Sequence, residues 1–235
     1  MKIHYWAIAA LAACCPNLAV AQDSSPHHVT FTGWLASDNV FRGMSQNDEN
    51  LTPQVAVDYV NDNGFYAGVW TAPVDYNDVS GANYEVDLYV GYKRNFGDDF
   101  AADLQYIRYT YPDAHDVDLE YHELVARLTF FQRALLLVGF SDDTFASGYN
   151  GLYANFSYSW KLPHDYNLIT GIGHYRFDRR QFAIADDYMD YNIGLNRIFG
   201  KLDTTLSFID TNDRGDRLFG RSAGRRLVLV LKYTF

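Results

Sequence analysis

The sequence of 235 residues has only two cysteines, Cys14 and Cys15, and both lie close to its start. The segment 1–21 has the layout of a secretory signal peptide, with a basic start, an apolar stretch and the small-x-small triplet Ala19-Val20-Ala21. Its removal would leave a mature chain, 22–235, without any thiol. This excludes disulfides, thiolate metal sites and a cysteine nucleophile.

A second processing signal overlaps the first one. Leu11-Ala12-Ala13-Cys14 resembles a bacterial lipobox, which would make Cys14 a lipidated N-terminus. We favour cleavage after Ala21, because the alanine-rich site follows the apolar stretch at a better distance for a signal peptidase. Both alternatives predict export from the cytoplasm.

Long hydrophobic runs, proline and positive charge are also scarce. Beyond the signal no run approaches the ~18 apolar residues that a membrane helix needs. The formal net charge of −10 argues against a nucleic-acid partner. Six prolines are too few for a disordered chain, while 19 Tyr and 16 Phe are too many for a helical bundle. The remaining classes are an exported soluble β protein and an outer-membrane β-barrel.

Alternation of apolar and polar residues divides the mature chain into about twelve segments of barrel-strand length. An even number is what a closed antiparallel barrel with both ends on one side requires. We therefore expect an all-β, antiparallel transmembrane barrel with both termini in the periplasm. The expected strands lie near residues 28–38, 51–61, 64–73, 83–94, 99–109, 117–130, 132–141, 149–160, 166–176, 188–199, 201–210 and 224–235.

The last nine residues have the pattern of a closing barrel strand. Every second residue from Leu227 onward is apolar, and this series ends on Tyr233 and Phe235. The residues between them, which point to the opposite face of a strand, include Lys232. We expect this strand to pair with residues 28–38, because an open edge would expose unpaired backbone groups to lipid. Tyr233 and Phe235 are the expected signal for the barrel assembly machinery.

The connections between the segments alternate in length. Short ones, such as 61–64 with its Asn-Gly pair and 199–201 with Gly200, are typical of tight hairpins. Short turns on one side and long polar loops on the other are the asymmetry of outer-membrane barrels. The longer, polar connections are 39–50, 74–82, 110–116, 142–148, 177–187 and 211–223.

The phase of the alternation predicts which charged residues face the lumen. In one interpretation, opposite charges pair across strands and plug a structural or adhesive barrel. In the other, they line an aqueous path that filters solutes. The candidate pore-lining residues are Glu85, Asp87, Asp103, Glu123, Arg127, His174, Arg176, Asp190, Arg226 and Lys232, together with Asp58.

Signals for catalysis and for metal binding are weak. Asp113-x-His115 resembles the Asp–His pair of omptin-like outer-membrane proteases, and a carboxylate that orients a histidine is sound general-base chemistry. Both residue types are nevertheless ordinary in loops. The segment 210–215 begins like a calcium loop but has Arg214 where an oxygen ligand belongs. We expect no enzyme activity, no metal and no cofactor.

The first half of the chain resembles a known family. Residues 37–46, SDNVFRGMSQ, are similar to its S-D-x-x-F-R-G-x-S-Q signature, and 64–70, 84–92 and 109–112 follow in the family's order. This is the family of TorF-type porins, also called the conserved hypothetical Gcw family. One departure is Asn39, where the family usually has an aromatic residue.

The resemblance implies an outer-membrane barrel, but it brings no established substrate or site. Asp38 and Arg42 lie in the first long loop, and we expect them to pair and to fold that loop toward the mouth. The predicted function is passive passage of small hydrophilic solutes. The expected partners are outer-membrane lipids, the barrel assembly machinery and small solutes.

These expectations predict a heat-modifiable protein that fractionates with outer membranes. A folded barrel resists detergent at room temperature and therefore migrates differently on gels before and after boiling. Recovery in the soluble periplasmic fraction would contradict the predicted class.

Overall fold

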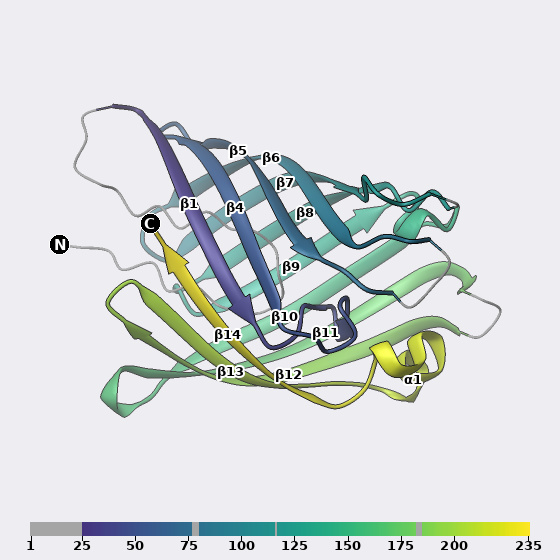
Figure 1. Ribbon diagram of the computed structural model, residues 1–235. Coiled ribbons are helices and arrows are strands. Elements are labelled where there is room, and N and C mark those ends of the chain that lie inside the picture. Colours follow the sequence, from purple (N-terminus) through teal and green to yellow (C-terminus); the bar gives the residue numbers. More distant parts are fainter. Residues whose placement is uncertain (1–24, 77–79, 116, 182–184) are drawn as a thin grey trace.

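The computed structural model describes residues 25–76, 80–115, 117–181 and 185–235. The predicted signal segment 1–21 lies outside this range. Within the described residues, twelve strands form one closed barrel in which neighbours in sequence pair antiparallel and β1 pairs with both β4 and β14 (Figure 1). The predicted fold class is therefore confirmed.

The strands match the predicted segments closely, and most bounds differ by three residues or fewer. The barrel strands are β1 (His27–Ala36), β4 (Thr52–Asn61), β5 (Phe65–Pro73), β6 (Tyr84–Phe96), β7 (Phe100–Thr110), β8 (Tyr121–Phe130), β9 (Ala134–Ser141), β10 (Gly151–Lys161), β11 (Tyr166–Gln181), β12 (Ala185–Phe199), β13 (Leu202–Thr211) and β14 (Arg226–Thr234).

The loops contain short elements that the sequence pattern does not reveal. Among them are a two-stranded hairpin, a seven-residue helix and three 3-10 turns, each too short to show a period. They are β2 (Val40–Phe41), β3 (Met44–Ser45), α1 (Asp213–Phe219), η1 (Thr144–Ala146), η2 (Pro163–Asp165) and η3 (Gly220–Ser222). In the described part of the chain, no helix is long and apolar enough to cross a membrane.

The alternating pattern of the strands becomes an apolar outside and a more polar inside. In β14 the side chain of Leu227 is 64% exposed, whereas that of Val228 is 3% exposed. In β4, Val57 is exposed and Asp58 is buried. Successive side chains of a strand point to opposite faces. The alternate apolar residues therefore form the outer surface of the barrel.

Short turns and long loops lie at opposite ends of the barrel. The turns 62–64, 97–99, 131–133 and 200–201 share one end with the C-terminus (Figure 1). The longer connections meet at the other end, where η1 and α1 are found. The two ends are named here the short-turn end and the long-loop end.

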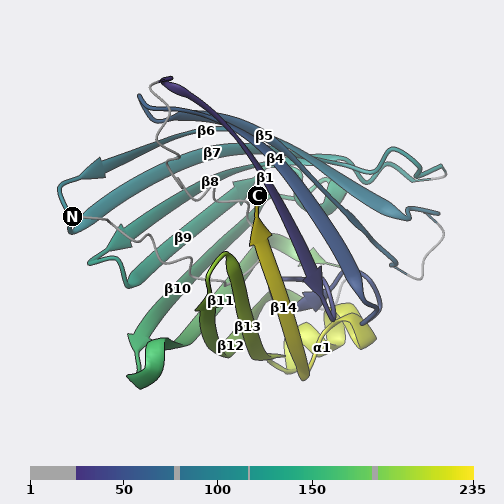
Figure 2. The ribbon, with the colours of Figure 1, turned by 60° about the vertical axis from the view of Figure 1, so that its left-hand side comes forward.

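The closing seam joins the first and last strands, which lie side by side in Figure 2. Leu35 is opposite Leu231, and Thr32 is opposite Thr234. Beyond the last strand residue, the backbone N–H of Phe235 donates to the carbonyl of Phe31 at 3.0 Å. The Phe235 ring packs edge-on against Tyr233, with 4.9 Å between ring centroids. The terminal aromatic residue thus extends the seam.

We expect deletion of Phe235 to lower the amount of assembled barrel, because it removes the terminal hydrogen bond and the ring contact of the seam. Phe131→Ala is the matched control, since Phe131 is an exposed aromatic residue in a turn at the short-turn end. Assembly is measured as the heat-modifiable fraction in isolated outer membranes. Wild-type levels of the deletion variant would refute the prediction.

Candidate functional site

Most of the charged residues predicted to face the lumen do occupy inward positions. Their sequence neighbours face outward and are exposed, as at Leu88 beside Asp87 and Leu124 beside Glu123. The predicted residues with inward positions are Asp58, Glu85, Asp87, Asp103, Glu123, Arg127, Asp190, Arg226 and Lys232.

The prediction is wrong for His174 and Arg176, which lie on the outer face of β11. His174 is half exposed and its Nε2 lies 3.1 Å from Asp187, which also pairs with Arg214. Their neighbour Tyr175 is fully buried inside the barrel. The alternation of residues shows which of them share a face but does not say which face is inside.

The segment 37–51, named here the inner loop, enters the barrel at the long-loop end. Its tip is the β2–β3 hairpin, which turns at Arg42 and Gly43 with φ of 51° and 84°. Positive φ at both central residues is the requirement of a tight type I′ hairpin. A Cβ atom on Gly43 would lie 2.7 Å from Thr211 and 2.8 Å from Asp190, so glycine is also needed for space.

The hairpin tip places the Arg42 guanidinium inside the barrel. Arg42 is 4% exposed, and its Nη2 donates to Oε2 of Glu123, which is fully buried on β8, at 2.6 Å. The guanidinium carbon also lies 4.4 Å, 4.3 Å and 4.9 Å from the ring centroids of Phe41, Tyr153 and Tyr175. Arg42 is therefore held by one carboxylate and three aromatic faces, named here the Arg42 cage.

The predicted Asp38–Arg42 pair does not form. Asp38 instead accepts a hydrogen bond from Ser45 at 2.7 Å and pairs with Arg226 of β14 at 3.1 Å. Burial raises the pKa of the Asp38 carboxyl, while the Ser45 and Arg226 donors act in the opposite direction. The two charged residues of the motif thus bind two separate places on the wall, because each finds a buried partner of opposite charge on a barrel strand.

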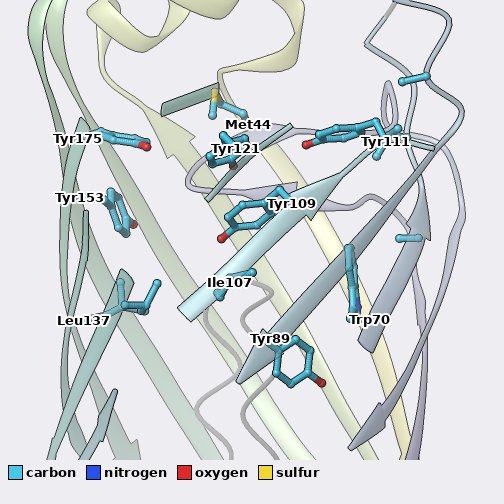
Figure 3. Close-up of a cluster of buried hydrophobic side chains, with 14 of the residues drawn as sticks. Met44, Trp70, Tyr89, Ile107, Tyr109, Tyr111, Tyr121, Leu137, Tyr153 and Tyr175 are labelled. Carbon is cyan, nitrogen blue, oxygen red and sulfur yellow. The ribbon is translucent and has the colours of Figure 1, made fainter. Parts of the chain in front are cut away.

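Aromatic side chains fill the space around the inner loop (Figure 3). Tyr109 and Tyr121 stack with ring centroids 4.4 Å apart, close to Met44 of the loop. Phe145 of η1 contacts the rings of Tyr121, at 5.7 Å, and of Phe219 of α1, at 6.4 Å. Elements far apart in the sequence are thus packed together at the long-loop end.

The tyrosines of the site were not singled out from the sequence. The hydroxyl of Tyr188 donates to the backbone carbonyl of Arg42 at 3.0 Å, and Tyr153 donates to Asp190 at 3.0 Å. A usable signal was present at Tyr153, which shares its strand face with the polar Asn155 and Ser157. A tyrosine on a polar face indicates a hydroxyl with an internal partner.

Carboxylates outnumber cations in the wall near the cage. The Glu85 side chain is hydrogen-bonded to Asp87, two residues along the same face of β6. Oδ1 of Asp87 and Oε1 of Glu123 are buried and have no hydrogen-bond partner among the described residues. With Asp190 these carboxyl groups make an acidic wall, which the Arg42 guanidinium contacts at Glu123.

Nearer the short-turn end, inward charges are spread around the barrel. Asp103 accepts from the hydroxyl of Tyr66 at 2.6 Å and lies 3.6 Å from Arg127. Tyr89 donates to Asp58. Lys232 lies over the ring of Trp34, 5.6 Å from its centroid. This part of the wall is polar and of mixed charge.

The structure does not assemble the Asp113–His115 pair expected of a protease. Oδ2 of Asp113 accepts from the backbone and side chain of Asn83 at 3.0 Å and 2.9 Å, and its Oδ1 is buried without a hydrogen-bond partner. The carboxylate therefore does not orient the His115 ring. Across the described ranges, no group of three His, Cys, Asp or Glu side chains could hold a metal ion.

Arg42→Ala should destabilise the barrel by roughly 3–5 kcal/mol, because it leaves the Glu123 carboxylate buried without its cation. Adding Glu123→Gln to that variant should restore part of the loss, whereas Glu123→Gln in the parent should be destabilising. The midpoint of urea unfolding of the refolded protein in lipid vesicles measures both effects.

The matched control is Arg108→Ala. Arg108 pairs with Glu120 at the same 2.6 Å, but both side chains are exposed. Exposed pairs contribute little, so we expect a small change. Equal losses in Arg42→Ala and in the double variant would contradict the role assigned to the buried pair.

The barrel is similar to the barrels of solved porins. The NanC porin superposes with a TM-score of 0.55 at 11% identity, covering 88% of this chain and 99% of NanC. The KdgM porin gives a TM-score of 0.51 at 9% identity, covering 88% and 98%, and KdgM in complex with disordered oligogalacturonate gives 0.52 at 8% identity over the same shares. At such identities the likeness shows a shared fold.

The family assignment comes from the sequence itself. No curated protein matches the chain. The bacterial family Gcw_chp, described as a protein of unknown function, matches residues 20–234. The match spans nearly the whole sequence, and the chain belongs to the Gcw_chp family.

Proposed function

We propose that this protein is an outer-membrane channel for small hydrophilic solutes, and that the inner loop closes it in the conformation described. The apolar outer face supports a place in lipid, because a large apolar side chain is exposed in the central part of every barrel strand other than β5 and β9. In those two strands the exposed ones, Phe65 and Phe140, lie at or next to a strand end. The long loops would then lie outside the cell and both termini in the periplasm. The assignment to TorF-type porins belongs to the same proposal.

The observation that carries the proposal is the charged inward wall. Asp58, Asp103, Arg127, Asp203 and Lys232 occupy inward positions nearer the short-turn end. A purely structural filling would be at least as stable with apolar side chains, because buried ion pairs recover little more than their desolvation cost. Charged groups on this wall are instead what a hydrated path requires.

The geometry of the inner loop supports closure by a movable segment. Its first residue is joined to the last strand through the backbone, where the N–H of Ser37 donates to the carbonyl of Leu229 at 2.9 Å. Directly after the tip, the carbonyl of Gln46 accepts from the N–H of Asp75, in the loop that follows β5, at 2.8 Å. The tip is held by the side chains of the Arg42 cage and by the hydroxyl of Tyr188. Release of the tip would break these side-chain contacts and the bond between Asp75 and Gln46, but no hydrogen bond between barrel strands.

The second candidate is a plugged barrel with a structural or adhesive role. It is favoured by the aromatic cluster, in which Tyr121, Phe145 and Phe219 join the wall to two further loops at the long-loop end. The two candidates differ in whether the lumen conducts ions after the tip is released.

Single-channel recording in planar bilayers tests the proposal. We expect brief, infrequent conductance steps in the parent, and longer openings in Arg42→Ala because its tip has lost the ion pair. Arg108→Ala should behave like the parent, since its pair lies on the exposed outer face. Absence of steps in all three proteins would favour the plugged barrel.

A further inference from the structure

The Arg42 cage has the composition of a binding site for an organic cation. Two of its aromatic faces, Tyr153 and Tyr175, belong to wall strands β10 and β11, and their rings lie 5.5 Å apart between centroids (Figure 3). Its carboxylate, Glu123, belongs to β8. Aromatic faces with a carboxylate are a general arrangement for binding guanidinium and ammonium groups.

The structure contains a ligand of this kind, although it is part of the chain. A guanidinium group is planar, stacks on aromatic rings and donates to a carboxylate through a fork of N–H groups. The guanidinium of Arg42 lies 4.3 Å from the Tyr153 centroid and donates one hydrogen bond, from Nη2 to Glu123 at 2.6 Å. Its contacts therefore show how the wall binds such a group.

Withdrawal of the tip would leave the wall part of the cage in place. Phe41 and Arg42 would leave together, whereas Tyr153, Tyr175 and Glu123 are fixed by strand pairing. Oδ1 of Asp87 and Oε1 of Glu123 already lack hydrogen-bond partners within the described chain while Arg42 is present. Once Arg42 leaves, Glu123 needs a new partner, which is either the water of the open path or a cationic solute.

We propose that the wall part of the Arg42 cage is the recognition site for a solute that carries a guanidinium group, and that Arg42 occupies this site as a tethered competitor when the channel is closed. The inference rests on the proposed channel function and names its substrate class. Such a solute binds the open state and not the closed one, and it therefore shifts the population toward the open state.

The charge of the wall is consistent with this class. Glu123 and Asp190 would repel a carboxylate-bearing sugar such as the oligogalacturonate present in the KdgM complex. A neutral sugar would leave the carboxylates without a counter-charge. A guanidinium compound satisfies both the carboxylates and the aromatic rings.

Chemical rescue tests the site directly. Ethylguanidinium is the probe, and ethylurea is its neutral analogue of nearly the same shape. Millimolar ethylguanidinium should raise the melting temperature of refolded Arg42→Ala, while ethylurea should not.

The additional change Glu123→Gln should weaken ethylguanidinium binding about tenfold or more, because the charged partner is lost. Arg108→Ala serves as the matched control and should show a smaller rise than Arg42→Ala, because the probe must compete with Arg42 for its cage.

Equal responses to the two probes, or a response unchanged by Glu123→Gln, would overturn the site. Should Arg42→Ala fail to fold, the parent provides the second measurement. There ethylguanidinium should increase the fraction of time that the channel is open, by displacing Arg42, and ethylurea should not. An open fraction that does not change with ethylguanidinium would contradict the inference.

The failure of this inference can be told apart from failure of the channel function. If Arg42→Ala binds ethylguanidinium but never conducts, the site stands and the channel is refuted. If it conducts but its melting temperature and current are unaffected by the probe, the channel stands and the recognition site is refuted.

Discussion

The buried ion pair between Arg42 and Glu123 organises the long-loop end of the barrel. It sets the position of the hairpin tip, and the tip in turn fills the space against which Tyr121, Tyr153 and Tyr175 pack. The pair forms because the turn geometry at Arg42 and Gly43 points the guanidinium toward β8. A buried charge tolerates few alternative positions, so this contact gives the inner loop a defined location.

The barrel architecture explains why such a loop can be accommodated. Eight strands enclose a space that side chains can just fill, and twelve strands enclose more. The inner loop and the rings of η1 and α1 occupy the additional space at one end of the barrel. The same inward residues can thus act as packing partners when the tip is inside and as lining when it is withdrawn.

The barrel itself could be predicted from the sequence, since strand periodicity and turn chemistry are local properties. Twelve segments, alternating loop lengths and the pairing of the last strand with the first are all present in the structure. The phase was wrong for His174 and Arg176, because the buried side of β11 contains aromatic rings and glycines rather than charges. In this part of β11 the aromatic residues face inward and the charged residues face outward, which is the reverse of what polarity indicates for the other strands.

The sequence by itself determined the fold class, the strands and most of the charged residues that face inward. The partners of those charges were decided by the tertiary structure. Asp38 and Arg42, four residues apart, are ion-paired to β14 and β8 rather than to each other. The closure of the whole barrel decides which strand a given loop residue contacts. A local pattern of residues contains no information about such contacts across the lumen.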